Sequence, residues 1–133
     1  MSASFVRQKT EEWCGDISQL LGIPFYKTVN IEVNPSDPVW FTVDYISLFH
    51  EGLLCKRGYL ERGIVRVVFA GEPGKGWEDT INAVEQVVPL LSDKLDPTRR
   101  FSWDSYEPIV EETDGSVNSG YMVSVAFNYL FQL

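Results

Sequence analysis

Residues 60–95, LERGIVRVVFAGEPGKGWEDTINAVEQVVPLLSDKL, change from the pattern of a strand to that of a helix. The β-branched run at 63–70 predicts a central strand over 60–70. A glycine-rich turn follows, and apolar residues then recur at helical spacing near 76–94. The predicted apolar stripe of this helix consists of Trp77, Ile81, Val84, Val88, Leu91 and Leu95. A strand that gives way to an amphipathic helix indicates a domain containing both.

The flanking segments extend this pattern in both directions. A first helix is predicted near 4–21, before the stop signals Gly22 and Pro24. Alternating or β-rich patterns predict further strands at 26–33, 39–46, 100–110 and 120–131. Residues 47–58 lack a clean period and are predicted to form a loop or an irregular hairpin. The whole chain, 1–133, is therefore predicted to be one α+β domain with two helices packed on an antiparallel-rich β-sheet.

Several side chains are expected to form the core of this domain. The apolar side of the first helix consists of Phe5, Val6, Trp13, Ile17, Leu20 and Leu21. The residues expected to be largely buried elsewhere are Phe41, Val43, Val65, Val67, Ile81, Val84, Val125 and Phe127. Pro89 should kink or split the second helix, because it cannot donate to the carbonyl of Glu85.

Composition excludes several classes of function. The formal net charge is −8, so a basic face for duplex DNA is not expected. The chain has no run of Lys and Arg, and no apolar run near the ~18 residues that span a bilayer, so neither membrane contact nor a signal peptide is expected. Cys14 and Cys55 form no disulfide or metal-ligand pattern, which favours a reducing, cytoplasmic setting.

The residues that usually carry catalysis are sparse in this sequence. His50 is the single histidine, and it lies in the least regular segment. The GEPGKG turn at 71–76 lacks the spacing of a phosphate-binding loop, so a plain tight turn is favoured over a weak anion site. Adjacent acids such as Glu111 and Glu112 point to opposite faces of a strand. We therefore expect no catalytic, cofactor-binding or metal-binding residue and no enzymatic activity.

Charge is distributed unevenly along the chain. Residues 56–75 hold five bases and two acids, whereas 101–133 hold five acids and no base. A solvated surface is one interpretation, and a pair of complementary patches on associating copies is the other. The candidate residues for such an interface are Leu48, Phe49, Leu53, Leu54, Arg57, Arg66, Glu111, Glu112 and Asp114.

Two stretches of the chain resemble one protein family. These are NIEVNPSDPVWFTV at 30–43 and RGYLERGIVRVVFAGEPGKGWEDTINAVEQVVPLL at 57–91. The proline-bracketed turn before an aromatic residue, the glycine-led strand and the glycine-rich turn before a helix are similar to those of the tail-terminator and tail-completion proteins of long-tailed phages. Pro89 and residues 97–119 fit that pattern less well.

The resemblance implies a virion structural protein. Copies of such a protein form a ring, expected to be a hexamer, that caps the tail tube, stops its polymerisation and provides the head-joining interface. Its expected partners are itself, the tail-tube protein and the head-side neck protein, with no specific nucleic acid, membrane or cofactor. Its expected location is the virion tail, after assembly in the host cytoplasm.

Other functions stay open at this point. The chain also suits another phage neck or tail-tube morphogenesis protein, which would polymerise or dock differently. A small α+β ligand-binding or enzymatic domain would use the 71–76 turn as an anion site. A general protein–protein adaptor is a further alternative.

Overall fold

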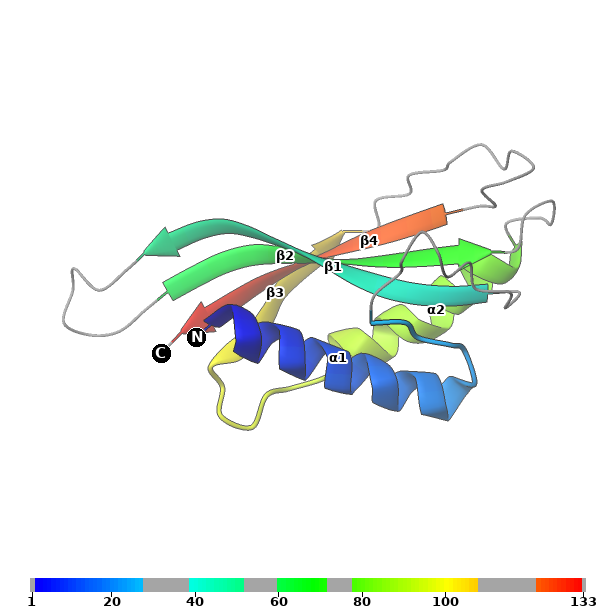
Figure 1. The fold of residues 1–133 in the computed structure, drawn as a ribbon, viewed down its shortest axis with the longest axis horizontal. Helices are drawn as coiled ribbons and strands as arrows, with labels where there is room; N and C mark the ends of the chain where they lie inside the picture. The colour runs from blue at the N-terminus through cyan, green and yellow to red at the C-terminus, as the bar shows by residue number, and fades with distance from the viewer. Residues whose placement is uncertain (1, 28–38, 52–59, 72–77, 108–121, 133) are drawn as a thin grey trace.

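The computed structural model describes residues 2–27, 39–51, 60–71, 78–107 and 122–132, with the side chains of residues 2, 3 and 47–51 excluded. Its elements in chain order are α1 (Ser2–Leu21), β1 (Val39–Glu51), β2 (Leu60–Gly71), α2 (Glu78–Ser92), β3 (Phe101–Glu107) and β4 (Met122–Gln132). Figure 1 shows both helices on the same side of one sheet. The predicted fold class, a single small α+β domain, is confirmed.

The four strands form one sheet in the order β1-β2-β4-β3. Each neighbouring pair is antiparallel. β2 and β3 consequently run in the same direction, with β4 inserted between them, and α2 connects β2 to β3 across the helical side of the sheet (Figure 1). This arrangement makes β4 a central strand although it follows the other three in sequence.

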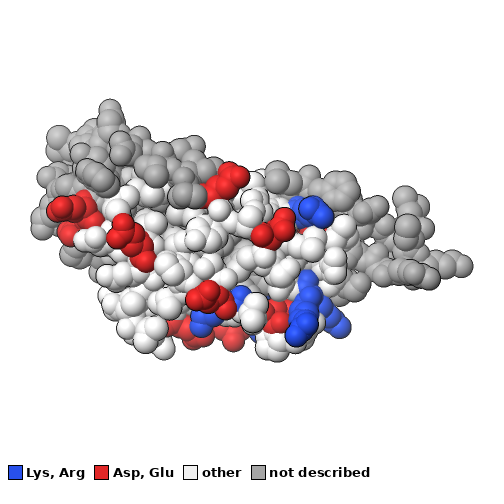
Figure 2. Space-filling view, turned by 180° about the vertical axis from the view of Figure 1, so that it is seen from behind, with Lys and Arg blue, Asp and Glu red and all other residues white. Residues whose placement is uncertain are grey.

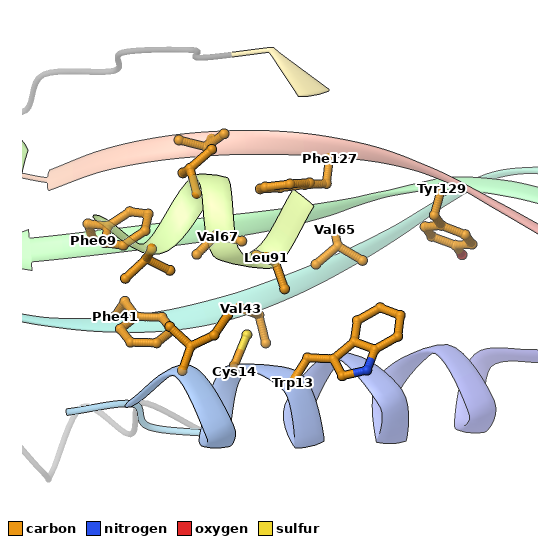
Figure 3. Packing of buried hydrophobic residues seen from close by; sticks show 14 of the residues in the cluster. Trp13, Cys14, Phe41, Val43, Val65, Val67, Phe69, Leu91, Phe127 and Tyr129 are labelled. Carbon is orange, nitrogen blue, oxygen red and sulfur yellow. The ribbon is translucent and has the colours of Figure 1, made fainter. Parts of the chain in front are cut away.

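The core lies between the two helices and the sheet (Figure 3). Alternate residues of β2, from Glu61 to Phe69, are buried and point toward the helices. In Figure 3, Trp13 and Cys14 of α1 point toward the sheet, with Leu91 of α2 nearby. The many aromatic residues contribute to this core, because their rings contact one another. Examples are the stacked pair Trp13–Phe101 and the edge-on pair Phe101–Trp103.

The predicted core is correct on the strands and shifted on the helices. Phe41, Val43, Val65, Val67, Val125 and Phe127 are all buried. Ile81 and Val84 are only partly buried, so their predicted burial is wrong. The buried face of α2 consists instead of Thr80, Ala83, Val87, Val88 and Leu91.

Two helical residues expected in the apolar stripes are exposed. Leu20 of α1 is 72% exposed, and Thr10 and Cys14 complete the buried face in its place. Leu95 is 82% exposed because α2 has already ended at Ser92, so helical spacing no longer applies. Pro89 does not split the helix, which continues from Glu78 through the proline to Ser92.

The boundaries of β1 differ from the prediction. The strand continues beyond residue 46 to Glu51, so the loop expected at 47–58 begins at least five residues too early. β1 and β2 pair as a hairpin, with a register shift between Ser47 and Phe49. The alternative of an irregular hairpin is therefore the better description of this segment. Of the strand predicted at 26–33, residues 26 and 27 are not in a strand, and 28–33 lie outside the described residues. An isolated bridge joins the preceding residue, Phe25, to Phe41.

Candidate assembly surfaces

The face of the sheet opposite the helices carries a mixture of apolar and charged side chains. Strand alternation and register assign to it Thr42, Asp44, Ile46, Ile64, Arg66, Val68, Ser124, Ala126, Asn128 and Leu130. Ile46 is 41% exposed, whereas Val68, Ser124 and Ala126 are buried. Within the described part of the chain, neither helix covers this face (Figure 1). Of the described residues on this face, Ile46 is a large apolar side chain that remains exposed.

One ion pair crosses the open face. Asp44 and Arg66 are direct neighbours in the register of β1 and β2. An Arg66 Nη2 atom donates to Oδ2 of Asp44 at 2.8 Å, and the two side chains are 41% and 53% exposed. The basic character expected for residues 56–75 is thus partly neutralised from the neighbouring strand.

The structure describes only part of the predicted interface set. Arg66 lies in β2, and Leu48 and Phe49 lie in β1, where Phe49 is the register partner of Arg62. The side chains of Leu48 and Phe49 are outside the described part of the structure. The remaining candidates, Leu53, Leu54, Arg57, Glu111, Glu112 and Asp114, lie outside the described residues.

The free edge of β1 is covered at one end. The Phe41 amide donates to Pro24 O, and the Tyr26 amide donates to Phe41 O, both at 3.0 Å. The Thr42 hydroxyl also donates to Tyr26 O at 2.7 Å. Among the described residues, no backbone hydrogen bond continues this pairing beyond Phe41. Within the described part of the chain, the following residues of β1 have no further strand beside them on this edge.

A groove of about 500 Å³ follows this open part of the β1 edge. Its lining residues are Arg7, Lys27, Thr42, Val43, Asp44, Tyr45, Ile46 and Arg66. The guanidinium of Arg7 lies 4.5 Å from the centre of the Tyr45 ring, and the Tyr45 hydroxyl donates to the backbone oxygen of Arg7 at 3.4 Å. Burial raises the pKa of Tyr45 above its ordinary value, so the phenol stays neutral. Three cationic groups and one carboxylate therefore surround this edge.

The opposite edge of the sheet, at β3, has a different character. A second groove, of about 450 Å³, is lined by Ser92, Trp103, Asp104, Ser105 and Tyr106. The register of β3 on β4 shifts between Trp103 and Ser105, which marks a bulge at Asp104. Glu107 ends the strand. The back view in Figure 2 shows acidic side chains scattered over this face and basic ones mostly in its right half, with acids among them.

Two ring residues fix the shape of the β3 edge. The indole N–H of Trp103 donates to Leu91 O at 3.0 Å and so attaches the strand to α2. Tyr106 stacks on Phe127 with ring centres 5.3 Å apart and remains 45% exposed. These contacts hold the edge strand against α2 and β4.

The buried acids are held by hydrogen bonds that suit structural roles. Glu61 is 1% exposed and accepts a hydrogen bond from the Tyr129 hydroxyl at 2.9 Å. Asp96 is 4% exposed and accepts from the amides of Thr98, Arg100 and Phe101 and from the Thr98 hydroxyl. Burial alone would raise the pKa of Asp96, but these hydrogen bonds outweigh it and hold the pKa below its ordinary value.

The buried Cys14 thiol has its pKa raised to about 12, chiefly by burial and then by the charge of Glu11.

The side chains that could bind a metal ion are not clustered in the described part of the chain. No cluster of three or more His, Cys, Asp or Glu side chains occurs there that could hold a metal ion. The His50 side chain and residues 72–76 of the turn, weighed above as possible sites, lie outside the described part of the structure.

Sequence reasoning missed both edge surfaces. Arg7 and Lys27 are far from β1 in sequence, and the acids of β3 were considered only as part of a long acidic stretch. Edge position depends on strand order, which hydrophobic periodicity does not encode. The sequence feature that indicates an edge strand is the polar segment DSYE at 104–107 within a predicted strand.

The described helices include none that is long and apolar enough to cross a membrane. Comparison with known proteins gives no family assignment: no protein-family model matches the chain, and no curated protein matches its sequence.

Proposed function

We propose that this protein is a tail-terminator subunit of a long-tailed phage. Copies of it form a closed ring that caps the tail tube, stops its growth and offers a surface to the head-side neck protein. The observation that carries the proposal is the asymmetry of the sheet, which has one face covered by helices and two edges of unlike charge. The resemblance at 30–43 and 57–91 supplies the family.

A ring requires two different surfaces on each subunit that match head to tail. A sheet with identical edges would favour a two-fold dimer, in which the same surface meets itself. Here the β1 edge is lined by Arg7, Lys27 and Arg66, and the β3 edge carries Asp104 and Glu107. Unlike surfaces of this kind support repeated association in one direction.

The acidity of the chain also suits a conduit for DNA. A net charge of −8 on each copy repels phosphate, so a ring of such subunits would let DNA pass without holding it. The exposed Ile46 side chain on the face opposite the helices provides a point of contact for a protein partner such as the end of the tube. No catalytic step is part of this proposal.

The test is the mass of the assembly as a function of protein concentration. Sedimentation velocity and light scattering of the purified chain should show one closed oligomer that does not grow further when concentration rises. Added to the tail tubes of the phage whose genome encodes the chain, the oligomer should be visible by electron microscopy at one tube end.

Other results separate the alternatives. Filaments of unlimited length would identify a tube-like subunit instead. A chain that stays monomeric at every concentration and fails to bind tube ends would refute the terminator proposal.

A further inference from the structure

We infer that each copy binds the next by adding the β3 edge of one subunit to the β1 edge of its neighbour, so that one sheet continues around the ring. This inference rests on the proposed function, because it specifies the contact between copies in the proposed ring. It names the second copy of this chain as the occupant of the β1 groove.

Hydrogen-bonding groups are available along the β1 edge. The amide and carbonyl of Phe41 point away from β2, since they bond to Tyr26 and Pro24. Backbone direction alternates along a strand, so the amides and carbonyls of Val43 and Tyr45 point the same way, into the groove. A strand that enters the groove can therefore pair with these two residues.

The segment at 24–26 limits where an incoming strand can bind. It already occupies the Phe41 position of the edge. Pairing is thus restricted to β1 residues after Thr42, which gives the contact a defined starting point. The described part of β3 beyond the bulge, Ser105–Glu107, is short enough to fit this stretch.

Strand direction agrees with such a contact. β1 and β4 run one way, and β2 and β3 run the other. When a second copy is placed in the same orientation, its β1 lies antiparallel to β3 of the first. The alternation of directions within the subunit therefore continues across the contact, and antiparallel strands pair well.

The charges at the two edges are complementary. Arg7, Lys27 and Arg66 outnumber Asp44 at the β1 groove, whereas β3 contributes Asp104 and Glu107. In the antiparallel arrangement the end of β3 meets the beginning of the open β1 edge, and Lys27 lies at that beginning. Glu107 of one copy is thus brought toward Lys27 of the next, which favours this partner over an edge of like charge.

The bulge at Asp104 disfavours pairing of the β3 edge with edges other than β1 of a second copy. An extra residue and a charge on an edge strand both hinder indiscriminate pairing of sheets. β3 therefore resists pairing with a second β3, and the cations resist pairing of two β1 edges. These features disfavour two-fold dimers and leave the unlike contact as the favoured one.

Charge reversal tests the partner assignment. Lys27→Glu and Glu107→Lys should each raise the concentration needed for half-assembly by about threefold to tenfold, and the double variant should recover most of that loss. Both residues are exposed, so the fold should be unaffected. Matched controls with the same charge changes are Lys9→Glu on α1 and Glu85→Lys on α2, which should leave assembly unchanged.

Amide hydrogen exchange tests the hydrogen bonds directly. The wild-type chain is compared at a concentration where it is monomeric and at one where the ring is complete. The amides of Val43 and Tyr45 and the amides within 105–107 that point away from β4 should exchange more slowly in the ring, while those of the central strand β4 serve as the reference.

The outcomes distinguish the two proposals. A closed ring with unchanged exchange at both edges, or with reversals that match the controls, would overturn the edge contact and leave the terminator proposal standing. Slower exchange at β1 alone, in a dimer, would also overturn it. A wild-type chain that never assembles overturns the terminator proposal itself.

Discussion

Replacing Gly63 with alanine should destabilise the protein, although alanine is normally better tolerated in a strand. Gly63 of β2 is the register partner of Tyr129 of β4, whose ring lies over it. A Cβ atom at Gly63 would be 2.6 Å from two carbons of that ring and 2.6 Å from the backbone oxygen of Ile46. Neither neighbour moves freely, because Ile46 is held in the β1–β2 ladder and the Tyr129 hydroxyl is bonded to Glu61.

The size of the effect follows from three contributions. Carbon atoms pack best at about 3.5–4.0 Å, so the methyl group would be roughly 1 Å too close. Overpacking of this kind costs ~1–3 kcal/mol, and displacement of the ring weakens a buried hydrogen bond worth roughly 1 kcal/mol. Removing a glycine from a strand offsets ~0.5–1 kcal/mol. The net loss in the free energy of unfolding should be about 2 kcal/mol.

Urea denaturation measures this loss as a lower midpoint with an unchanged slope. The same substitution in a Tyr129→Val background should cost at least about 1 kcal/mol less, because residues in contact are energetically coupled. Part of the cost should persist there, since the Ile46 oxygen remains. A neutral Gly63→Ala variant, or an equal cost in both backgrounds, would refute the reasoning.

Three further predictions concern groups described above. The pKa of Asp96 is lowered in the folded state, so its contribution to stability is present above the unfolded pKa near 3.9 and is lost as pH falls through the folded pKa. Asp96→Asn should therefore lower the free energy of unfolding at neutral pH and flatten the acid side of its pH dependence. An unchanged acid side would contradict this. Because burial raises the pKa of the Cys14 thiol to about 12, a Cys55→Ser variant should not react with a thiol reagent at pH 8 until denaturant is added, and rapid labelling of the native protein would disprove the assignment. Asp44 and Arg66 form an exposed pair, so Asp44→Asn should change the free energy of unfolding by less than about 1 kcal/mol, with a larger loss indicating that the pair is shielded from solvent.

The strands were the part of the fold best predicted from sequence. The segment predicted as a strand at 120–131 is β4, Met122–Gln132, and its alternation is strong because one face meets the helices. Prediction stopped at 46 on β1 because the register shift between Ser47 and Phe49 disrupts the alternation on which it depended. A bulge is a feature of pairing, and a single strand read alone does not reveal it.

The buried face of α2 is harder to predict, because hydrophobicity alone does not show which side chains of this helix are buried. Thr80 and Ala83 are buried, while the larger Ile81 and Val84 are only partly buried. Glu61 was missed for a related reason. A charged residue is expected to be exposed, and its burial depends on a hydroxyl from Tyr129, sixty-eight residues away in sequence.

The sequence predicts which charged residues the candidate surfaces contain, but not which of them lie on the same surface. Charge segregation along the chain is visible in the sequence, and it pointed to residues 56–75 and to the acids after 101. Which charges share a surface depends on strand order, which places Lys27 beside β1 and Asp104 at the opposite edge. The acidic turn at Glu111, Glu112 and Asp114 lies outside the described residues, so the interface predicted there stays a prediction.

The central position of β4 has a consequence for synthesis on the ribosome. β4 pairs with both β2 and β3, yet it is translated after both. A nascent chain that has not reached Met122 has a β1–β2 hairpin whose inner edge is unpaired, and β3 has no neighbour in the sheet. That inner edge is open to pairing with other nascent chains during translation. The sheet is therefore complete only after translation of β4, so premature termination before Met122 should yield aggregates rather than a smaller folded domain.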